Sequence, residues 1–264
     1  MIKTLFAAAT LLTALPALAQ INIATPATTY SESFDGLLAT GATNTWTNNS
    51  TVAGWSAFTY TNLPIATYAA GNGSGTTGAI YSFGTDAERA LGGLASANTY
   101  WGTPGPVAGT VAGYIALALV NGSAVAYDSF TIGFRGEQWR NGGNITAQTM
   151  VLEFGFGASF TAVTTWTAPG GNFNWVSPVA TATAAIIDGN TTGLVAGKGG
   201  TVSTNWAPGS TLWVRWIENN DLSNDHGLAI DNVSFSVTAV PEPTTYALLL
   251  AGLGVVLFLA RRRG

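Results

Sequence analysis

The sequence of 264 residues contains no cysteine, a single histidine and few charged side chains, which make up 8% of the chain. The absence of cysteine excludes disulfide bonds, thiol nucleophiles and thiolate metal sites, so the fold depends on its hydrophobic core. The scarcity of charge disfavours long amphipathic helices, because their polar faces need charged residues. The chain is instead rich in glycine, with 33 residues, and 47% of it is hydrophobic. With abundant threonine, valine and aromatic residues, this composition favours short strands joined by tight turns.

The formal net charge of −4 understates the acidity of the central region, because basic residues gather at the two ends. Removing Lys3 and the three arginines at 261–263 from nine basic residues leaves five, and removing Glu242 from thirteen acidic residues leaves twelve, a net charge of −7. A domain with this charge lacks the basic stripe that phosphate binding needs, so we expect no nucleic acid partner. Cations are the more compatible ligands.

The first 19 residues have the three parts of a secretory signal peptide. Lys3 supplies a positive charge, residues 5–15 are apolar, and small residues stand at the cleavage positions Ala17 and Ala19. We therefore predict that residues 1–19 are removed by signal peptidase and that the mature chain begins at Gln20. A buried core helix is the alternative, but the segment starts at residue 1 and ends in a cleavage sequence. The rest of the chain is then exported.

The C-terminal end carries a second processing signal, which we assign to residues 240–264. It consists of Val240, Pro241, Glu242 and Pro243, an apolar stretch at 246–260, and finally Arg261, Arg262 and Arg263. A helix over residues 244–260 would be about 26 Å long at ~1.5 Å per residue, so it would span a ~30 Å hydrocarbon core only marginally. The arginines would hold the C-terminus on the cytoplasmic side. We therefore predict a transmembrane helix that leaves the preceding domain outside the inner membrane.

This order of parts resembles the PEP-CTERM sorting signal, a segment also described at the C-terminus of certain ice-binding proteins. The resemblance covers about 25 of the 264 residues. It implies recognition by an exosortase in a Gram-negative bacterium that makes exopolysaccharide, with cleavage near the Pro-Glu-Pro sequence. The protein would pass through the inner membrane as an intermediate and reach the cell surface or the extracellular matrix. The tail indicates how the protein is sorted, and it is no evidence that the domain binds ice.

Residues 20–239 have the pattern of one all-β domain. Apolar residues alternate with polar or small ones at 129–134 and 150–156, which predicts strands buried on at least one face, while 212–217 is apolar on both faces and should be central. Glycine-rich and asparagine-rich turns separate the strands at 71–75, 141–144, 169–172 and 198–200. We predict an antiparallel β-sandwich of jelly-roll or lectin-like type with ten or more strands.

Three short segments support the same prediction by resemblance. Residues 34–36, 136–140 and 225–233 resemble parts of the β-sandwich ectodomains that often accompany such tails. They are also similar to extracellular lectin-like jelly rolls, in which the first and last strands are neighbours. The resemblance therefore implies that the start and the end of the domain lie side by side.

Acidic residues gather before the last predicted strand. Glu218, Asp221 and Asp225 lie within eight residues, and Asp231 follows shortly. Their hard oxygen ligands suit a structural calcium ion, although the spacing is not that of an EF-hand. The apolar alternation changes phase just after Asp231, which predicts a β-bulge that would aim its carboxylate at the loop or at Asp35 on the first strand. A solvated acidic loop without an ion is the alternative.

We expect no enzymatic activity from this chain. Its only histidine, His226, is not accompanied by the Gly-x-Ser-x-Gly sequence of a hydrolase nucleophile. Glycoside hydrolysis needs two positioned carboxylates, for which Glu137 and Glu153 are the candidates. Glu137, however, is near Arg135 and Arg140 in the sequence and is more simply explained as an ion-pair partner.

The nine tryptophans offer aromatic faces on which sugar rings could stack. Trp213 and Trp216 lie on opposite faces of one predicted strand, so they cannot both contact a ligand on one surface. Trp166 and Trp175 flank a turn and are the better carbohydrate-binding candidates. A secreted carbohydrate-binding module is thus the alternative to a non-enzymatic surface or matrix protein with possible exopolysaccharide contacts, and a carbohydrate-active enzyme comes third.

Overall fold

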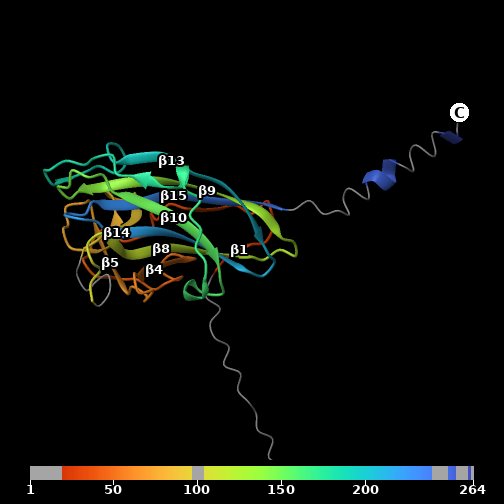
Figure 1. Ribbon diagram of the computed structural model, residues 1–264, viewed down its shortest axis with the longest axis horizontal. Helices are drawn as coiled ribbons and strands as arrows, with labels where there is room; N and C mark the ends of the chain where they lie inside the picture. The colour runs from red at the N-terminus through yellow and green to blue at the C-terminus, as the bar shows by residue number, and fades with distance from the viewer. Residues whose placement is uncertain (1–19, 97–103, 240–248, 254–260, 263–264) are drawn as a thin grey trace, which may run out of the picture.

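The structure is a computed structural model that describes residues 20–96, 104–239, 249–253 and 261–262. The predicted signal peptide, including Ala17 and Ala19, lies outside the described residues. Strands dominate the described part and form two sheets, and most of the long strands run close to the long axis of the molecule (Figure 1). Two short 3₁₀-helices, η2 (Phe160–Ala162) and η3 (Gly171–Phe173), lie in the connections.

The two sheets draw their strands from the whole domain. The first sheet has six strands: β1 (Ile21–Ile23), β4 (Trp55–Thr59), β8 (Thr110–Asn121), β10 (Thr149–Phe156), β11 (Trp175–Val176) and β14 (Thr211–Asn220). The second sheet has nine strands: β2 (Tyr30–Glu32), β3 (Asn44–Thr45), β5 (Thr67–Gly71), β6 (Ala79–Phe83), β7 (Ala90–Leu94), β9 (Tyr127–Asn141), β12 (Ala185–Ile186), β13 (Leu194–Trp206) and β15 (Gly227–Ala239).

Most neighbouring strands are antiparallel, but the prediction of a purely antiparallel arrangement is wrong for two pairs. β1 pairs in parallel with β8, and β5 pairs in parallel with β6. The β1–β8 pair joins segments far apart in the sequence, whereas β5 and β6 are parallel despite a short connection between Gly71 and Ala79. The strand β14 lies between β8 and β10, so its predicted central position is confirmed.

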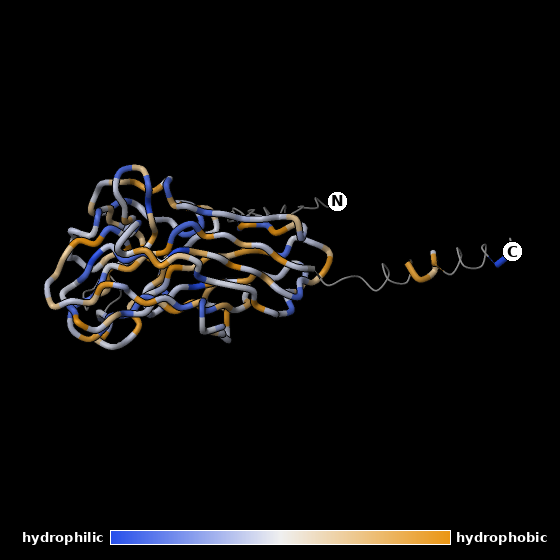
Figure 2. The backbone as a smooth tube through the Cα atoms, turned by 90° about the horizontal axis from the view of Figure 1, so that it is seen from above, coloured by the Kyte–Doolittle hydropathy of each residue, from blue (hydrophilic) through white to orange (hydrophobic). Residues whose placement is uncertain are grey.

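The main core lies between the two sheets, and hydrophilic and hydrophobic positions alternate along the strands (Figure 2). The predicted inward faces are confirmed by the buried side chains that they contribute: Phe130, Ile132 and Phe134 from the nine-stranded sheet, and Leu152, Leu212, Val214 and Trp216 from the six-stranded sheet. Neither sheet has a wholly solvated outer face, because a smaller apolar cluster covers part of each. The described part of the chain is therefore a sandwich-like, mostly β structure with three clusters of buried apolar residues.

The smaller cluster on the nine-stranded sheet determines where the candidate site lies. It contains Tyr81, Phe83, Trp139 and Ala229, whose sequence neighbours Ile80 and Ile230 belong to the main core instead. Since successive side chains of a strand point to opposite faces, this cluster lies on the outer face of the sheet. The rings of Phe83 and Trp139 stack with their centroids 6.4 Å apart. Part of the outer face is thus buried rather than exposed to water.

The strand β15 connects the two ends of the domain and contains the predicted bulge. It pairs with β9 along most of its length, and its pairing with β2 places an early strand beside the last one. The pairing with β9 changes register between Asp231 and Ser234, and Asn232 adopts a positive φ of 49°. The bulge inferred from the phase change is therefore confirmed. After the bulge, the positions that face the main core change from even-numbered to odd-numbered residues.

The glycine cluster at 198–200 does not form the predicted turn, because it lies inside β13. Gly199 has a φ of 105° and lies directly over the backbone of Ile132 on β9, where a Cβ atom would collide with the carbonyl oxygen. The pairing between β13 and β9 shifts register just before, between Val195 and Lys198. Here glycine permits a close approach of two strands rather than a reversal of the chain.

Candidate functional site

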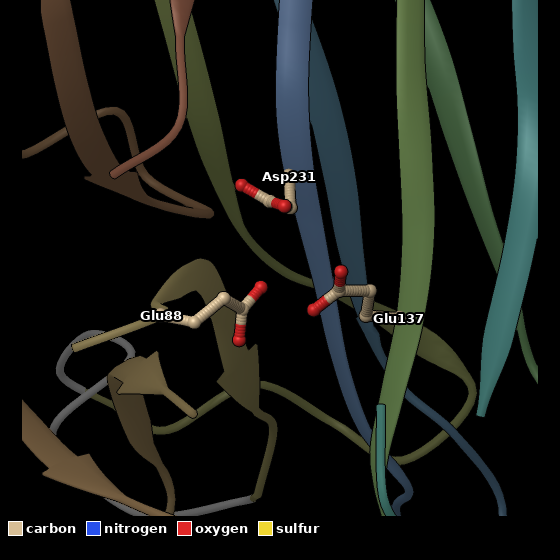
Figure 3. A group of neighbouring side chains, drawn as sticks. All are labelled: Glu88, Glu137 and Asp231. Atoms are coloured by element: carbon tan, nitrogen blue, oxygen red, sulfur yellow. The ribbon is translucent and has the colours of Figure 1, made fainter. Parts of the chain in front are cut away.

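Three carboxylates meet on the outer face of the nine-stranded sheet (Figure 3). Glu137 lies on β9, Asp231 lies on β15 just before the bulge, and Glu88 lies in the connection between β6 and β7. One oxygen from each residue lies within 4.8 Å of the others. Glu137 is 0% exposed and Asp231 is 1% exposed, while Glu88 is half-buried. We call Glu88, Glu137 and Asp231 the acidic trio.

Each member of the acidic trio is held by one hydrogen bond to one of its two oxygens. The Trp139 indole Nε1 donates to Glu137 Oε2 at 3.0 Å, and the Asn232 amide Nδ2 donates to Asp231 Oδ2 at 2.6 Å. Asn190 Nδ2 donates to Glu88 Oε2 at 2.6 Å. The second oxygen of each carboxylate is buried and has no hydrogen-bond partner among the described residues. The hydrogen bonds therefore fix the three side chains and leave three oxygens free.

Burial and nearby like charges raise the pKa of two members of the acidic trio, Glu137 and Asp231. Burial raises the pKa of Glu137 to about 8, and the neighbouring carboxylates of Asp231 and Glu88 raise it further. Burial also raises the pKa of Asp231 to about 7, with contributions from Glu88 and from Asp35. Both shifts have the sign expected for carboxylates that are removed from water and placed beside like charges.

The structure divides the five residues proposed as calcium ligands between two places. Asp231 faces Glu88 and Glu137, and Asp35 is near enough to influence its pKa. Both oxygens of Asp35 already accept hydrogen bonds, from the Arg89 backbone N–H at 3.0 Å and from Ser33 Oγ at 2.9 Å. Of the two directions considered for the Asp231 carboxylate, the structure thus places it toward Asp35 and away from the loop at 218–225.

Glu218, Asp221 and Asp225 form a separate acidic group near the end of β14. Glu218 is buried, and in the described part of the chain one of its oxygens, Oε2, has no hydrogen-bond partner. Burial raises the pKa of Glu218 well above its ordinary value, and the neighbouring carboxylates of Asp225 and Asp221 raise it further. Asp225 Oδ1 accepts the Asp221 backbone N–H at 2.7 Å, so this carboxylate closes the loop. Within the described residues these three carboxylates do not converge as closely as the acidic trio.

Sequence reasoning missed Glu88 and assigned Glu137 a different role. Glu88 lies in an irregular connection where no alternation predicts a direction for its side chain. Glu137 was expected to pair with Arg135 or Arg140, yet within the described residues the one ion pair joins Arg215 and Glu153. Arg135 is exposed, and Arg140 Nη1 donates to the Gly73 carbonyl. The burial of Glu137 beside Trp139 is a tertiary effect that no local pattern reveals.

The two carboxylates considered for glycoside hydrolysis lie in different sheets. Glu153 on β10 belongs to the six-stranded sheet, where its Oε2 accepts hydrogen bonds from Arg215 Nε and Nη2 at 2.8 and 2.5 Å. Glu137 belongs to the nine-stranded sheet. Each side chain lies on the outer face of its own sheet, so the main core separates them. They cannot flank one glycosidic bond, and this pairing is wrong.

The two tryptophans proposed as sugar platforms have different environments. Trp175 is 1% exposed in the main core, where its ring packs against the backbone of Gly136. It cannot stack on a ligand, and its assignment as a carbohydrate contact is wrong, because the short strand β11 turns the ring inward. Trp166 is partly exposed, and its ring lies 3.9 Å from the guanidinium carbon of Arg215.

A cavity adjoins the surface around Trp166 on the outer face of the six-stranded sheet. It has a volume of about 320 Å³, and its lining includes Phe58, Phe160, Trp213 and Asn62. Phe160 also contacts Trp166, with ring centroids 5.2 Å apart. Trp213 lies here while Trp216 lies in the main core, which confirms that these two tryptophans occupy opposite faces of β14.

The described residues of the C-terminal tail are helical. Residues 249–253 are apolar and exposed, and Arg261 and Arg262 are also exposed. Val240, Pro241, Glu242, Pro243 and Arg263 lie outside the described residues. In the part of the chain that the structure describes, no helix is long and apolar enough to cross a membrane. The transmembrane helix over 244–260 therefore remains a prediction.

Residues 239–263 match the family model described as the PEP-CTERM protein-sorting motif. The chain carries a PEP-CTERM sorting motif. This motif marks a protein that is exported toward the cell surface of a Gram-negative bacterium and processed by an exosortase. The match begins at the last residue of β15, so the PEP-CTERM motif follows directly on the sandwich. It says nothing about what the sandwich itself binds.

Comparison with curated proteins finds no match. Among solved structures, the PEP-CTERM chain is similar to the CBM22-1-GH10 modules of the Clostridium thermocellum endo-1,4-β-D-xylanase 10B, solved in complex with xylohexaose. The identity is 13% and the TM-score is 0.27, and the match covers 76% of this chain and 29% of that chain. At this level of similarity the match supports no conclusion about the ligand of the sandwich.

Proposed function

We propose that this protein is a non-enzymatic, exported protein that an exosortase delivers to the cell surface or the extracellular matrix through its C-terminal PEP-CTERM motif. The observation that carries the proposal is the match of residues 239–263, directly after the last strand of the sandwich. The sandwich is then the exported domain, and the C-terminal tail is its sorting signal. Signal peptidase and the exosortase are the processing partners, and the inner membrane holds the intermediate.

Two observations support a non-enzymatic role. The sequence has no cysteine, and its single histidine, His226, is 1% exposed, so it is not available to a substrate. The strand carboxylate Glu153 is committed to an ion pair with Arg215. A hydrolase needs an accessible base and a second group positioned beside it.

The sorting proposal is tested by the mass of the mature protein in strains with and without the exosortase. In the parent strain we expect a chain that begins at Gln20 and has lost its end near Val240–Pro243. Without the exosortase, the tail should remain and the protein should stay in the inner-membrane fraction. Replacing Pro241 and Pro243 together with alanine should have the same effect, whereas Pro208→Ala, in an exposed turn of the sandwich, should not. Identical mature masses in both strains would refute the proposal.

A secreted carbohydrate-binding module is the second candidate function. The partly exposed Trp166 and the adjoining cavity support it, because an aromatic ring beside polar side chains suits a sugar. Binding to a polysaccharide of the producing strain that disappears in Trp166→Ala would favour this function. Trp175 is not a suitable probe, since its replacement would disrupt the core.

A further inference from the structure

The unpartnered oxygens of the acidic trio receive no hydrogen bond or ion pair from the described side chains. Carboxylates buried without a counter-charge are costly, so such groups either bind protons or coordinate a cation. Arg89 follows Glu88 in the sequence, but its guanidinium donates to Ser82 through both Nε and Nη2. Arg135 lies opposite Asp231 in the sheet and is exposed, so its charge offsets only part of the rise in the pKa of Glu137 and Asp231. Within the described residues no ion pair reaches the trio.

The spacing of the three carboxylates fits a single ion. Calcium binds oxygen ligands at about 2.3–2.6 Å, so two ligands of one ion are at most roughly 5 Å apart. One carboxylate oxygen from each of the three residues lies within 4.8 Å of the other two. Only carboxylates are present, and hard oxygen ligands without histidine or cysteine select calcium or magnesium rather than zinc or copper.

We propose that Glu88, Glu137 and Asp231 bind one calcium ion. Calcium fits better than magnesium because three carboxylates from separate elements form an irregular set, which calcium accepts, whereas magnesium demands a near-ideal octahedron. Glu88 is half-buried and offers the ion a path from solvent, and water would complete the coordination. Trp139, Asn190 and Asn232 each hold one carboxylate, so the site is positioned before the ion binds.

The ion would join three separate parts of the chain. Glu137 and Asp231 lie on the neighbouring strands β9 and β15, and Glu88 belongs to the connection between β6 and β7. Asn190, which binds Glu88, lies in the segment between β12 and β13, so that segment is tied to the same point. An ion that binds the folded chain and not the unfolded chain stabilises the fold. We therefore expect calcium to raise the melting temperature.

Calcium titration of the purified full-length chain, followed by calorimetry, tests the proposal directly. We expect one ion per chain and a higher melting temperature in calcium than in chelator. Terbium should occupy the same site and emit on excitation of tryptophan, because Trp139 Nε1 lies 3.0 Å from Glu137 Oε2. Glu137→Gln and Asp231→Asn keep the side-chain shape and remove one charge, and each should weaken binding about tenfold or more.

Matched controls distinguish this site from the acidic group at the end of β14. Glu218→Gln and Asp225→Asn remove the same charge at that group and should leave the calcium affinity unchanged. If the buried variants fail to fold, Glu88→Gln at the half-exposed position tests the same site. The proposal is overturned if the wild type binds no stoichiometric ion and melts identically in calcium and in chelator. It is also overturned if Asp225→Asn abolishes binding while the three trio variants retain it.

Discussion

At the scale of single residues, Glu218 shows how burial sets the protonation state of a carboxyl group. It lies on β14, is 3% exposed, and faces the carboxylates of Asp225 and Asp221. Burial and these neighbours raise its pKa well above the ordinary value, and burial likewise raises the pKa of Asp225 to about 7. The folded protein therefore keeps protons that the unfolded chain has already lost.

This difference predicts the direction in which stability changes with pH. A folded-state pKa above the unfolded value contributes stability below the unfolded pKa, and that contribution is lost as the pH rises through the folded pKa. We therefore expect the free energy of unfolding to fall as the pH rises from about 4.5, by at most ~1.4 kcal/mol per pH unit for each such group. Urea denaturation at a series of pH values above about 4.5 measures this change in the free energy of unfolding.

Glu218→Gln isolates the contribution of one residue to the pH dependence. The amide mimics the neutral acid, so the variant should show a shallower decline than the wild type when both are measured in saturating calcium. Asp128→Asn, at an exposed position, serves as the control and should not change the slope. Parallel curves for Glu218→Gln and the wild type would show that this carboxyl group does not titrate as its burial implies.

At the scale of elements, the bulge in β15 depends on the backbone conformation of Asn232. Its φ of 49° lies in the left-handed region, which glycine adopts freely, asparagine tolerates and β-branched residues avoid. Asn232→Gly and Asn232→Val both remove the hydrogen bond to Asp231 Oδ2. The difference between the two variants therefore reports mainly the cost of the left-handed backbone conformation, reduced by the larger entropy that glycine loses on folding.

We expect Asn232→Val to be less stable than Asn232→Gly by about 1–2 kcal/mol, the usual cost of a left-handed conformation for a residue with a Cβ atom. Thermal or urea denaturation of the two variants measures the difference. Equal stability of the two would show that the chain can remove the bulge by shifting its register. Such a shift would also turn Asp231 away from Glu137.

The strands that could be predicted from the sequence are those with a regular alternation of apolar residues. A buried strand must present apolar residues to the core, so apolar alternation predicts which face of a strand is buried. This holds for Phe130, Ile132 and Phe134 on β9 and for the two apolar faces of β14. The change of phase after Asp231 predicted the bulge for the same reason. In each of these cases the information is local.

The features that could not be predicted depend on contacts between distant segments. Glu88 joins the acidic trio only because the connection between β6 and β7 brings it to β9 and β15. The residues around Glu88 in the sequence have no pattern that predicts this position. Trp175 turns into the core because Gly136, far away in the sequence, leaves room for its ring.

At the scale of the whole molecule, the sandwich and the sorting motif form separate parts of the chain. The main core is built from residues between Ile23 and Val237, and the PEP-CTERM match covers 239–263. The sandwich therefore has its full set of core residues before the motif begins. Folding and sorting should be separable by truncation.

A chain that ends at Ala239 should fold as stably as the longer protein. Because the removed residues contribute nothing to the described core, we expect the free energies of unfolding of the two chains to agree within about 0.5 kcal/mol, the usual range for changes away from the core. Urea denaturation followed by tryptophan fluorescence measures both. In the cell the shorter chain should be exported but not anchored, and it should appear in the soluble fraction.

A second truncation, after Asn232, provides the matched control because it removes only seven further residues but cuts into the core. It deletes Val233, Phe235 and Val237, which are 0%, 2% and 7% exposed, and it leaves β9 and β2 without the end of β15 between them. Each buried side chain of this size contributes about 1.5–3 kcal/mol, and a whole domain is stable by only about 5–15 kcal/mol. This chain should therefore be unfolded. If the truncation after Ala239 were also unfolded, the tail would belong to the fold, and sorting could not be separated from it.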